Sequence, residues 1–375
     1  MCGLSTFGKS RLVLTADRIS WRNEKSDNEI LLKDFTIQPQ SAQTIQILNK
    51  HELHLRLQLA NLKEFVNDEY DSQLEYILSC SGQDQMLKIH CKQCQYPITH
   101  QNRVFSRVLE LPSENWQEYL DNWCCHGNDA IFKLKDCTNP REHDCFLGDW
   151  YIVLHPLAIN TNNVFLSMKD NNGVSCGKCK AKLGEVTTTE QRTTRRLSPE
   201  LIKYVSVKLF KHSISLYATV SPILQDIFTG FGEEKYLARK FKSLSKTCLC
   251  HKFIVNKITA AKQTNDLSIL LIWILNIDTK FVSSLHSTQH SRKYEEWTMN
   301  AFSGVKVLFK LFLDDDFIKK QNEWHKNDRY DVVDLPEVIS LRLISFLHKN
   351  NKILPQSLRN VNNFKCFLQV SFLKL

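Results

Sequence analysis

The sequence predicts an α+β fold, with a β-rich first domain followed by a mixed α/β second domain. Short or alternating apolar runs dominate the first half of the chain, which is the pattern of half-buried strands. Helical spacing of apolar residues becomes frequent in the second half. The chain has 375 residues, a length that fits two domains of ordinary size.

The first half contains one clear helix among its expected strands. Ser113 is a candidate N-cap after Pro112, and Trp116, Leu120 and Trp123 follow at i, i+4 and i+7. These large side chains would share one face. The strands expected around it are residues 11–21, 29–37, 52–59, 87–90, 103–111 and 150–157.

A polar stretch rich in Thr and Arg, residues 187–199, is the best candidate for a linker. We therefore expect one domain over residues 1–190 and a second over residues 200–375. In the second domain we expect helices within residues 221–246 and over residues 335–349. The strands expected there are residues 204–217, 253–258, 267–277, 305–313 and 367–375, of which 267–277 is apolar enough to be buried.

Several classes of protein are excluded by missing patterns. The longest mainly apolar run, 267–277, is too short to span a bilayer, which takes about 20 residues. The N-terminus lacks the apolar segment of a secretory signal, so we expect the protein in the cytoplasm, with the nucleus as a second location. The phosphate loop, the dinucleotide fingerprint, HExxH and GxSxG are all missing, which excludes the usual kinases, dehydrogenases, zinc proteases and α/β-hydrolases.

Positive charge is concentrated in one part of the chain. The formal net charge is +9, and residues 192–260 alone carry 13 Lys and Arg against 4 Asp and Glu. Such a stretch fits an acidic protein partner, a nucleic acid, or merely a solvated helix face. Few aromatic residues interleave with these basic ones, which argues against direct nucleic-acid binding.

Eight of the 13 cysteines lie between residues 91 and 179, and four of them form two CxxC pairs. Without a secretory signal, clustered cysteines more often bind metal than form disulfides. Cys91, Cys94, Cys176 and Cys179 together have the spacing of a four-cysteine structural zinc site. Two independent reduced turns, or a redox pair, remain as alternatives.

A second cluster of cysteine and histidine follows the expected helix. It comprises Cys124, Cys125 and His126, with Cys137, His143 and Cys145 farther on. These residues fit a second metal site or a nucleophilic cysteine beside a histidine, and buried inert thiols are the third interpretation. The end of a helix disfavours a thiolate, so simple activation of a nucleophile there is the weaker of the first two.

Several segments resemble the HECT-like ubiquitin-protein ligases that bind a ubiquitin-conjugating enzyme. The specific ones are RVLELPSENWQEYLDNWCCH at 107–126, HDCFLGD at 143–149 and CGKCKAKLGE at 176–185. HLRLQ at 54–58, LLIWILNID at 270–278, AFSGVKVL at 301–308 and LPQSLRNVNNF at 354–364 add to the resemblance. It extends from about residue 50 to the end, and identifies the second domain as HECT-like.

The resemblance implies an E3 ligase that accepts ubiquitin from a conjugating enzyme and passes it to lysines. It implies that the basic helix meets the conjugating enzyme, through Lys235, Arg239 and Lys240. A HECT enzyme carries its acceptor cysteine in a Thr-Cys motif near the C-terminus. Here the nearest cysteine is Cys366, between Lys365 and Phe367, so the acceptor is not identified.

The family also implies a non-catalytic alternative, in which the protein is a zinc-stabilised partner, chaperone or inhibitor of the endonuclease of pre-mRNA cleavage and polyadenylation. Cys125 is then implied to contact that enzyme's active-site metal, and a soft thiol suits zinc. The residues implied to reach the endonuclease are Pro112, Trp116, Trp123, Cys124, Cys125 and His126.

Overall fold

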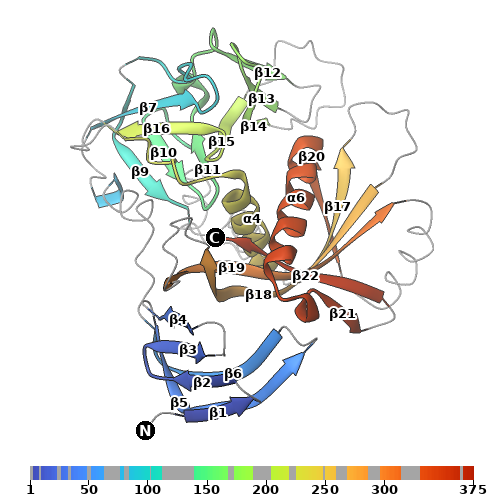
Figure 1. Cartoon of the computed structure of the whole chain (residues 1–375). Coiled ribbons are helices and arrows are strands. Elements are labelled where there is room, and N and C mark those ends of the chain that lie inside the picture. The colour runs from blue at the N-terminus through green and yellow to red at the C-terminus, as the bar shows by residue number, and fades with distance from the viewer. Residues whose placement is uncertain are drawn as a thin grey trace, which may run out of the picture. The chain divides into compact units, whose positions relative to one another are not determined.

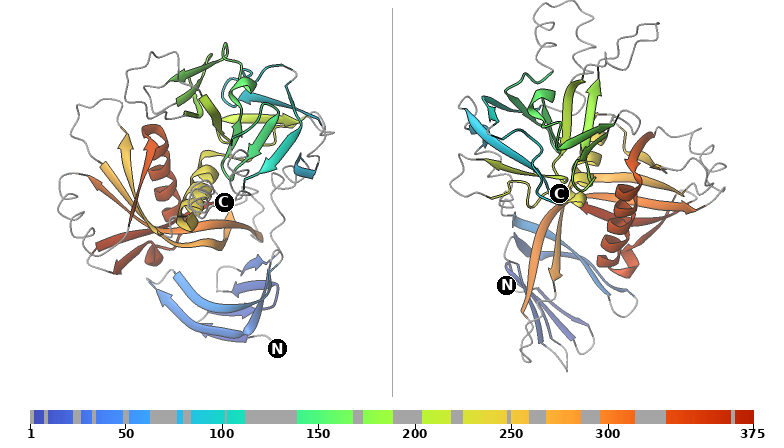
Figure 2. Two further views of the ribbon diagram at one scale, coloured as in Figure 1. Left: turned by 180° about the vertical axis from the view of Figure 1, so that it is seen from behind. Right: turned by 90° about the horizontal axis from the view of Figure 1, so that it is seen from above.

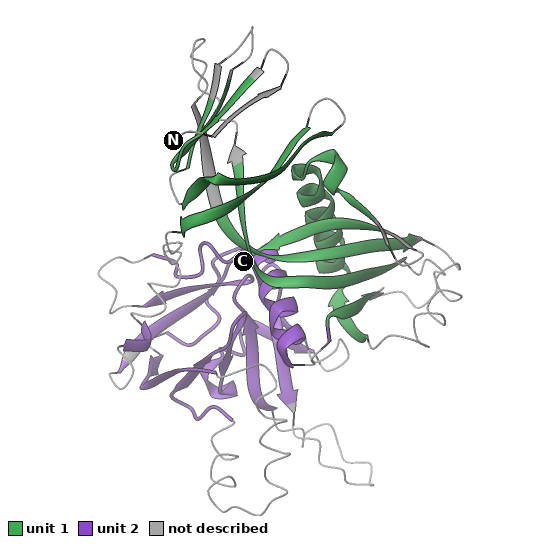
Figure 3. Ribbon diagram, turned by 90° about the horizontal axis from the view of Figure 1, so that it is seen from below, with its two compact units in different colours: residues 1–67, 251–375 green, residues 68–250 purple. Residues whose placement is uncertain are grey.

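The computed structural model forms two compact units, which are described separately below (Figure 3). Unit 1 combines Met1–Asn67 with His251–Leu375, and unit 2 is Asp68–Cys250. Strands predominate in both units, which confirms the β-rich character expected for the first half of the chain and extends it to the second half. The structure describes residues 3–7, 10–22, 27–32, 35–48, 52–62, 77–79, 84–101, 103–111, 139–167, 173–188, 204–218, 225–247, 250–258, 268–285, 296–313, 330–363 and 366–375.

The N-terminal part of unit 1 is built from antiparallel strands around a small apolar core (Figure 1, blue). Leu12, Leu14, Leu32 and Ile37 are buried together in this core. Leu55 and Leu57 of the long β5–β6 hairpin pack against it, which is why 52–59 alternates in polarity. The strands are β1 (Gly3–Phe7), β2 (Ser10–Leu14), β3 (Arg18–Arg22), β4 (Asp27–Leu31), β5 (Phe35–Leu48) and β6 (Glu52–Leu62).

The C-terminal part of unit 1 extends the same sheet. Its strand order is β1-β2-β3-β4-β19-β18-β17-β20, and β22 pairs with both β19 and β21. Leu270, Leu271 and Ile272 of β18 are buried between neighbouring strands, as expected for the apolar run. The strands are β17 (Lys252–Ile258), β18 (Ser268–Leu285), β19 (Glu296–Leu313), β20 (Asp331–Pro336), β21 (Asn360–Asn363) and β22 (Cys366–Lys374).

Helix α6 (Glu337–Ile353) packs against β17, β20 and β22 of this sheet, and the short 3-10 helix η3 (Gln356–Leu358) follows it (Figure 2). Buried polar side chains fix the helix to the C-terminal strand. The Nδ2 atom of Asn350 donates to the carbonyl oxygen of Phe372 at 2.7 Å, and that of Asn351 donates to Val370 at 2.8 Å. These bonds hold β22 in register, because a buried amide left without them would cost free energy.

Unit 2 contains a seven-stranded sheet with the order β12-β13-β14-β15-β11-β10-β9 and a three-stranded sheet with the order β16-β7-β8. The first sheet comprises β9 (Arg107–Glu110), β10 (Asp144–Leu147), β11 (Tyr151–Leu154), β12 (Val164–Ser167), β13 (Gly173–Cys176), β14 (Lys182–Thr188) and β15 (Tyr204–Phe210). The second comprises β7 (Gln85–Cys91), β8 (Val104–Phe105) and β16 (Ile214–Ala218), and the 3-10 helix η1 (Pro156–Ala158) precedes β12.

The helix of unit 2 that was expected within 221–246 is α4 (Glu233–Thr247). Tyr236, Leu237 and Phe241 on one side of it are buried. The ring of Tyr236 lies 5.2 Å from that of Trp150 and 4.2 Å from that of His212. An apolar stripe of this kind anchors α4 within unit 2.

The compact units divide the chain differently from the expected boundary between 1–190 and 200–375. The polar stretch 187–199 begins within β14 and leads toward β15, and these two strands pair antiparallel in one sheet. It therefore connects neighbouring strands. Residues 1–67 group with the C-terminal residues, because β4 pairs in parallel with β19.

Two segments expected as single strands each contain two strands. Residues 11–21 contain β2 and β3, joined where the Thr15 amide donates to the Arg18 carbonyl at 2.9 Å. Residues 204–217 contain β15 and β16, which turn at Lys211–Ser213 and enter different sheets. The expected helix 113–123 lies outside the described residues. Among the helices that are described, none is long and apolar enough to cross a membrane.

Candidate metal centre

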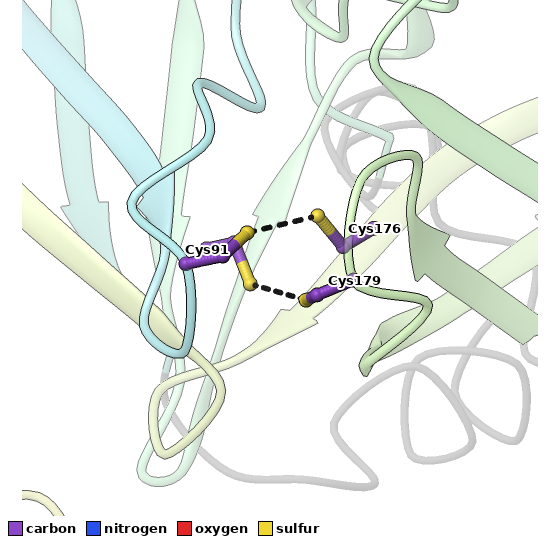
Figure 4. A group of neighbouring side chains, drawn as sticks. Cys91, Cys176 and Cys179 are labelled. Carbon is purple, nitrogen blue, oxygen red and sulfur yellow. Dashed lines mark hydrogen bonds between the residues drawn. The ribbon is translucent and has the colours of Figure 1, made fainter.

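The two CxxC pairs, 85 residues apart at their first cysteines, converge on one point of unit 2 (Figure 4). The Sγ atoms of Cys91 and Cys179 are 3.6 Å apart, and those of Cys94 and Cys176 are also 3.6 Å apart. All four sulfur atoms lie within 4.8 Å of one another. A disulfide needs about 2.05 Å between sulfurs, so these four cysteines are thiols.

The arrangement fits one metal ion held by four thiolates. Zn–S bonds are about 2.3 Å long, so a tetrahedral site separates its sulfurs by about 3.8 Å. Cys91 and Cys176 are fully buried, and Cys94 and Cys179 are half-buried. Four protein ligands leave no open coordination position, and such a metal ion would therefore stabilise the fold.

Residues 91–94, the first knuckle, and residues 176–179, the second knuckle, share one backbone pattern. The amide of Gln95 donates to the Cys91 carbonyl at 2.8 Å, and the amide of Lys180 donates to the Cys176 carbonyl at 3.0 Å. Gln95 and Lys180 both have positive φ angles, 56° and 62°. This costly conformation at equivalent non-glycine positions aims two thiols of each turn at the same point.

Strand pairing places each knuckle. Cys91 ends β7, opposite Ile214 of β16, and Cys176 ends β13, opposite Val164 of β12. Asn163 then connects the two: its side-chain Nδ2 donates to the Pro97 carbonyl at 3.1 Å, and its carbonyl accepts from the Gly177 amide at 2.8 Å. The knuckles are thus tied together by protein contacts as well as by their thiols.

A bound metal cation would change the protonation state of the Cys91 thiol. Burial raises the pKa of its thiol to about 12, so the uncompensated thiolate is disfavoured at neutral pH. A bound cation reverses this preference, since a thiol that coordinates a metal is deprotonated. The four thiols can hold a metal ion, and its binding would release protons.

The expected partner-binding residues Pro112, Trp116, Trp123, Cys124, Cys125 and His126 lie outside the described residues, as does Cys137. The strands on either side of that segment are described, and they lie side by side. β9 and β10 pair in parallel, with Arg107 opposite Asp144. The described chain therefore stops at residue 111 and resumes at residue 139, close to the paired strands β9 and β10.

An ion pair between the partly exposed Arg107 side chain and the buried Asp144 carboxylate links these two strands. Arg107 contacts both carboxylate oxygens of Asp144, with Nε to Oδ1 at 2.8 Å, and the Arg141 amide donates to Asp144 at 2.9 Å. Burial alone would raise the pKa of Asp144, but these hydrogen bonds hold it below its usual value. The carboxylate stays charged and keeps the two strands in register.

The three basic residues expected to meet a partner do not form a freely exposed face of α4. Lys235 is 9% exposed. Arg239 and Lys240 are half-buried, with the guanidinium 5.7 Å from the ring centre of Phe231 and the ammonium 5.0 Å from that of Trp150. Their aliphatic stems and charges are used in packing within unit 2, which the sequence did not indicate.

Two further lysines, Lys211 and Lys92, make contacts within unit 2 that the sequence did not indicate. Lys211 is 1% exposed, its Nζ lies 3.4 Å from the Asp149 carbonyl oxygen, and burial lowers its pKa to about 7. Lys92, inside the first knuckle, contacts a distant turn. No sequence pattern marks either residue, because each contact joins segments that are far apart in the chain.

Cys366, the cysteine nearest the C-terminus, begins β22 opposite Asn363.

Comparison with known proteins agrees with the resemblance seen in the motifs. A human protein that is named as an E3 ubiquitin-protein ligase is 28% identical over 367 residues, which cover 90% of this chain and 84% of the human one. The mouse protein of the same name is 29% identical over 346 residues, which cover 90% and 83% of the two chains. No solved structure matches the chain.

These relatives support a role related to ubiquitin ligation. The family model described as "HECT-like Ubiquitin-conjugating enzyme (E2)-binding" matches residues 8–366. This match spans nearly the whole sequence, including both knuckles and the paired strands β9 and β10, and the chain therefore belongs to the HECT-like family that binds a ubiquitin-conjugating enzyme.

Proposed function

We propose that this protein is an E3 ubiquitin-protein ligase, which binds a charged conjugating enzyme and promotes transfer of ubiquitin to lysines. The observation that carries the proposal is the family match over residues 8–366. The relatives named as E3 ligases support it. In this proposal the four thiols hold a structural zinc ion and take no part in the transfer.

The transfer has two chemical routes. In the first, a thiolate of this protein attacks the thioester carbonyl of the conjugating enzyme, the enzyme's cysteine leaves as a thiol, and a lysine amine then attacks the new thioester. In the second, the lysine amine attacks the conjugating enzyme's thioester directly. Both routes end in an amide bond and regenerate the thiols.

None of the cysteines whose side chains the structure describes is well placed to accept ubiquitin, because each is buried or belongs to the four-thiol cluster. Cys145 is fully buried, and burial raises the pKa of its thiol to about 12. Cys250 is 3% exposed. Cys91, Cys94, Cys176 and Cys179 are grouped in the metal centre. If the first route operates, the acceptor is a cysteine whose side chain the structure does not describe, such as Cys366 or Cys125.

A charging reaction tests the first route. The full chain is incubated with activating enzyme, conjugating enzyme, ATP and ubiquitin, and analysed with and without reducing agent. An adduct that reducing agent removes, and that Cys366→Ser or Cys125→Ser abolishes, identifies the acceptor. A ligase activity that persists in both variants, with no such adduct, assigns the direct route. Lack of any activity in the metal-loaded protein contradicts the proposal.

A second candidate function is binding to the pre-mRNA cleavage endonuclease, and the paired strands that flank the 112–138 segment favour it. The parallel pair β9–β10 and the Arg107–Asp144 ion pair would present that segment to a partner. Cys125→Ala should then lose endonuclease binding in a pull-down with purified proteins and keep ligase activity. Unchanged binding by this variant contradicts a contact through Cys125.

A further inference from the structure

A lysine inside the first knuckle reaches into another segment of unit 2. Lys92 Nζ donates to the carbonyl oxygen of Phe228 at 2.6 Å and to that of Phe231 at 3.1 Å. These carbonyls belong to a tight turn, in which the Phe231 amide donates to the Phe228 carbonyl at 3.0 Å. Hydrogen bonds from an ammonium group are stronger than those between neutral groups. One side chain thus bonds the knuckle to this turn twice.

The turn leads directly into α4. The carbonyl of Gly232 accepts from the Tyr236 amide at 3.0 Å, so the helix begins as the turn ends. The start of the turn is also fixed, since Asp226 Oδ1 accepts from the amides of Leu216 at 2.9 Å and Phe228 at 3.0 Å. Movement at the turn would therefore be transmitted to the first turn of α4.

The side chains around this contact are well packed. Phe228 and Phe231 are fully buried. Lys92 is half-buried, and burial lowers its pKa while Asp226 favours its charged form. Its backbone is held as well, with the Lys92 amide donating to the Ser213 carbonyl at 3.0 Å. A buried ammonium is costly to leave without acceptors, so the lysine and the turn stabilise each other.

The second knuckle lacks this connection. Its position after the first cysteine is Gly177, which has no side chain, and the next residue, Lys178, is exposed. A Cβ atom on Gly177 would lie 2.6 Å from the Asn163 carbonyl oxygen. Gly177 therefore contacts Asn163 through its backbone amide, and the exposed Lys178 offers a matched control for Lys92.

We propose that Lys92 couples metal occupancy of the four-thiol centre to the position of the 228–231 turn and the first turn of α4. A metal ion fixes Cys91 and Cys94 on either side of Lys92, and so fixes the point from which its ammonium reaches the turn. Loss of the ion frees the knuckle and weakens both hydrogen bonds. If α4 meets a conjugating enzyme, as the family resemblance implies, metal occupancy would regulate that contact, and the coupling itself does not depend on this function.

Hydrogen exchange of the full, zinc-loaded chain tests the coupling. Lys92→Met should keep its zinc but exchange the amides of residues 228–240 about tenfold faster than the wild type, because about 1.4 kcal/mol of lost stabilisation is a factor of ten. Lys178→Met should leave exchange unchanged. Normal exchange in Lys92→Met overturns the proposal, and so does an equal increase in both variants.

Removing zinc with a chelator provides the second comparison. In the wild type, exchange over residues 228–240 should rise, and in Lys92→Met it should rise much less, because the connection is already broken. Equal increases in the two proteins would contradict coupling through Lys92. If chelation also exposes β14 and β15, unit 2 has unfolded as a whole, and the zinc-loaded variants then decide the question. No ubiquitin is involved, so failure here is distinct from failure of the ligase proposal.

Discussion

The Sγ atoms of Cys91 and Cys179 lie 3.6 Å apart, although 88 residues separate them in the chain. Cys91 ends a strand of the three-stranded sheet, and Cys179 follows a strand of the seven-stranded sheet. A metal ion between them would therefore join the two sheets of unit 2.

The first prediction concerns the metal centre. We expect the purified protein to hold one zinc ion, and Cys91→Ser and Cys176→Ser each to lose it, because three remaining thiols bind zinc more weakly. In small zinc sites roughly 10 kcal/mol or more of binding free energy contributes to folding, so both variants should also unfold at a much lower temperature. Elemental analysis and thermal unfolding measure the two effects.

Cys250→Ser is the control for this prediction, since Cys250 is buried outside the four-sulfur cluster. It should keep a full complement of zinc even if it is less stable. Folded wild-type protein without zinc would contradict a structural zinc site. Two ions per chain, each lost from only one of the variants, would show that the knuckles bind metal separately.

The second prediction concerns Gly177. Its backbone lies so close to Asn163 that an added Cβ would be 2.6 Å from the Asn163 carbonyl oxygen, which belongs to the backbone directly before β12. Gly177→Ala should therefore destabilise the protein by about 1–3 kcal/mol, the usual cost of overpacking, and weaken metal binding. Gly230→Ala is the matched control, because no atom lies within 4 Å of a Cβ there. Equal unfolding free energies for the two variants in urea would contradict the close approach.

The third prediction concerns Asp144, whose carboxylate holds β9 and β10 together through Arg107. Asp144→Asn keeps the shape but removes the charge, and should cost about 1–3 kcal/mol in urea unfolding. Glu142→Gln, which changes an exposed partner of Arg103, should have little effect. The ion pair is unimportant if the two variants are equally stable.

The fourth prediction concerns Glu52 and the dependence of stability on pH. Its carboxylate accepts hydrogen bonds from the Ser357 hydroxyl and amide and contacts His54 Nε2 at 3.0 Å, so it links β6 to η3 within unit 1. The Ser357 hydroxyl, and then His54, lower the pKa of Glu52 from 4.5 to about 2. Because the folded pKa is the lower one, this stabilisation is complete above pH 4.5 and is lost as the pH falls toward 2.

Urea unfolding between about pH 7 and pH 2 tests this sign, since that range includes both pKa values of Glu52. The wild type should lose more stability over the acidic range than Glu52→Gln, whose side chain does not titrate there. Asp278→Asn, a change at an exposed carboxylate, serves as the control and should follow the wild type. Parallel curves for the wild type and Glu52→Gln would contradict a link through the Glu52 carboxylate.

Local patterns predicted the elements well. The alternation of 52–59 predicted β6, the apolar run 267–277 predicted the buried β18, and the spacing of apolar residues predicted α4 and α6. The CxxC spacing also predicted which four cysteines lie together, because two thiols on one tight turn are a common way to bind a metal ion. The family followed from motifs of specific residues.

Long-range relationships were not predictable from these patterns. Nothing in residues 1–67 indicates that β4 pairs with β19, because strand pairing is decided by contacts between distant segments. The expected boundary near residue 190 rested on composition, and a polar connection between neighbouring strands has the same composition as a linker. The sequence alone does not show that Lys92 contacts the turn at Phe228–Phe231, or that Lys235 is largely buried.

Discharge of ubiquitin from a charged conjugating enzyme onto free lysine is the decisive measurement for the proposed ligase function. The conjugating enzyme is charged, the activating enzyme is stopped, and the full zinc-loaded chain is added. We predict that the thioester is lost faster with this protein than without it. We also predict that Cys91→Ser, which lacks the metal centre, gives no such acceleration. A discharge rate that the folded, zinc-loaded protein leaves unchanged, over a panel of conjugating enzymes, would contradict a ligase.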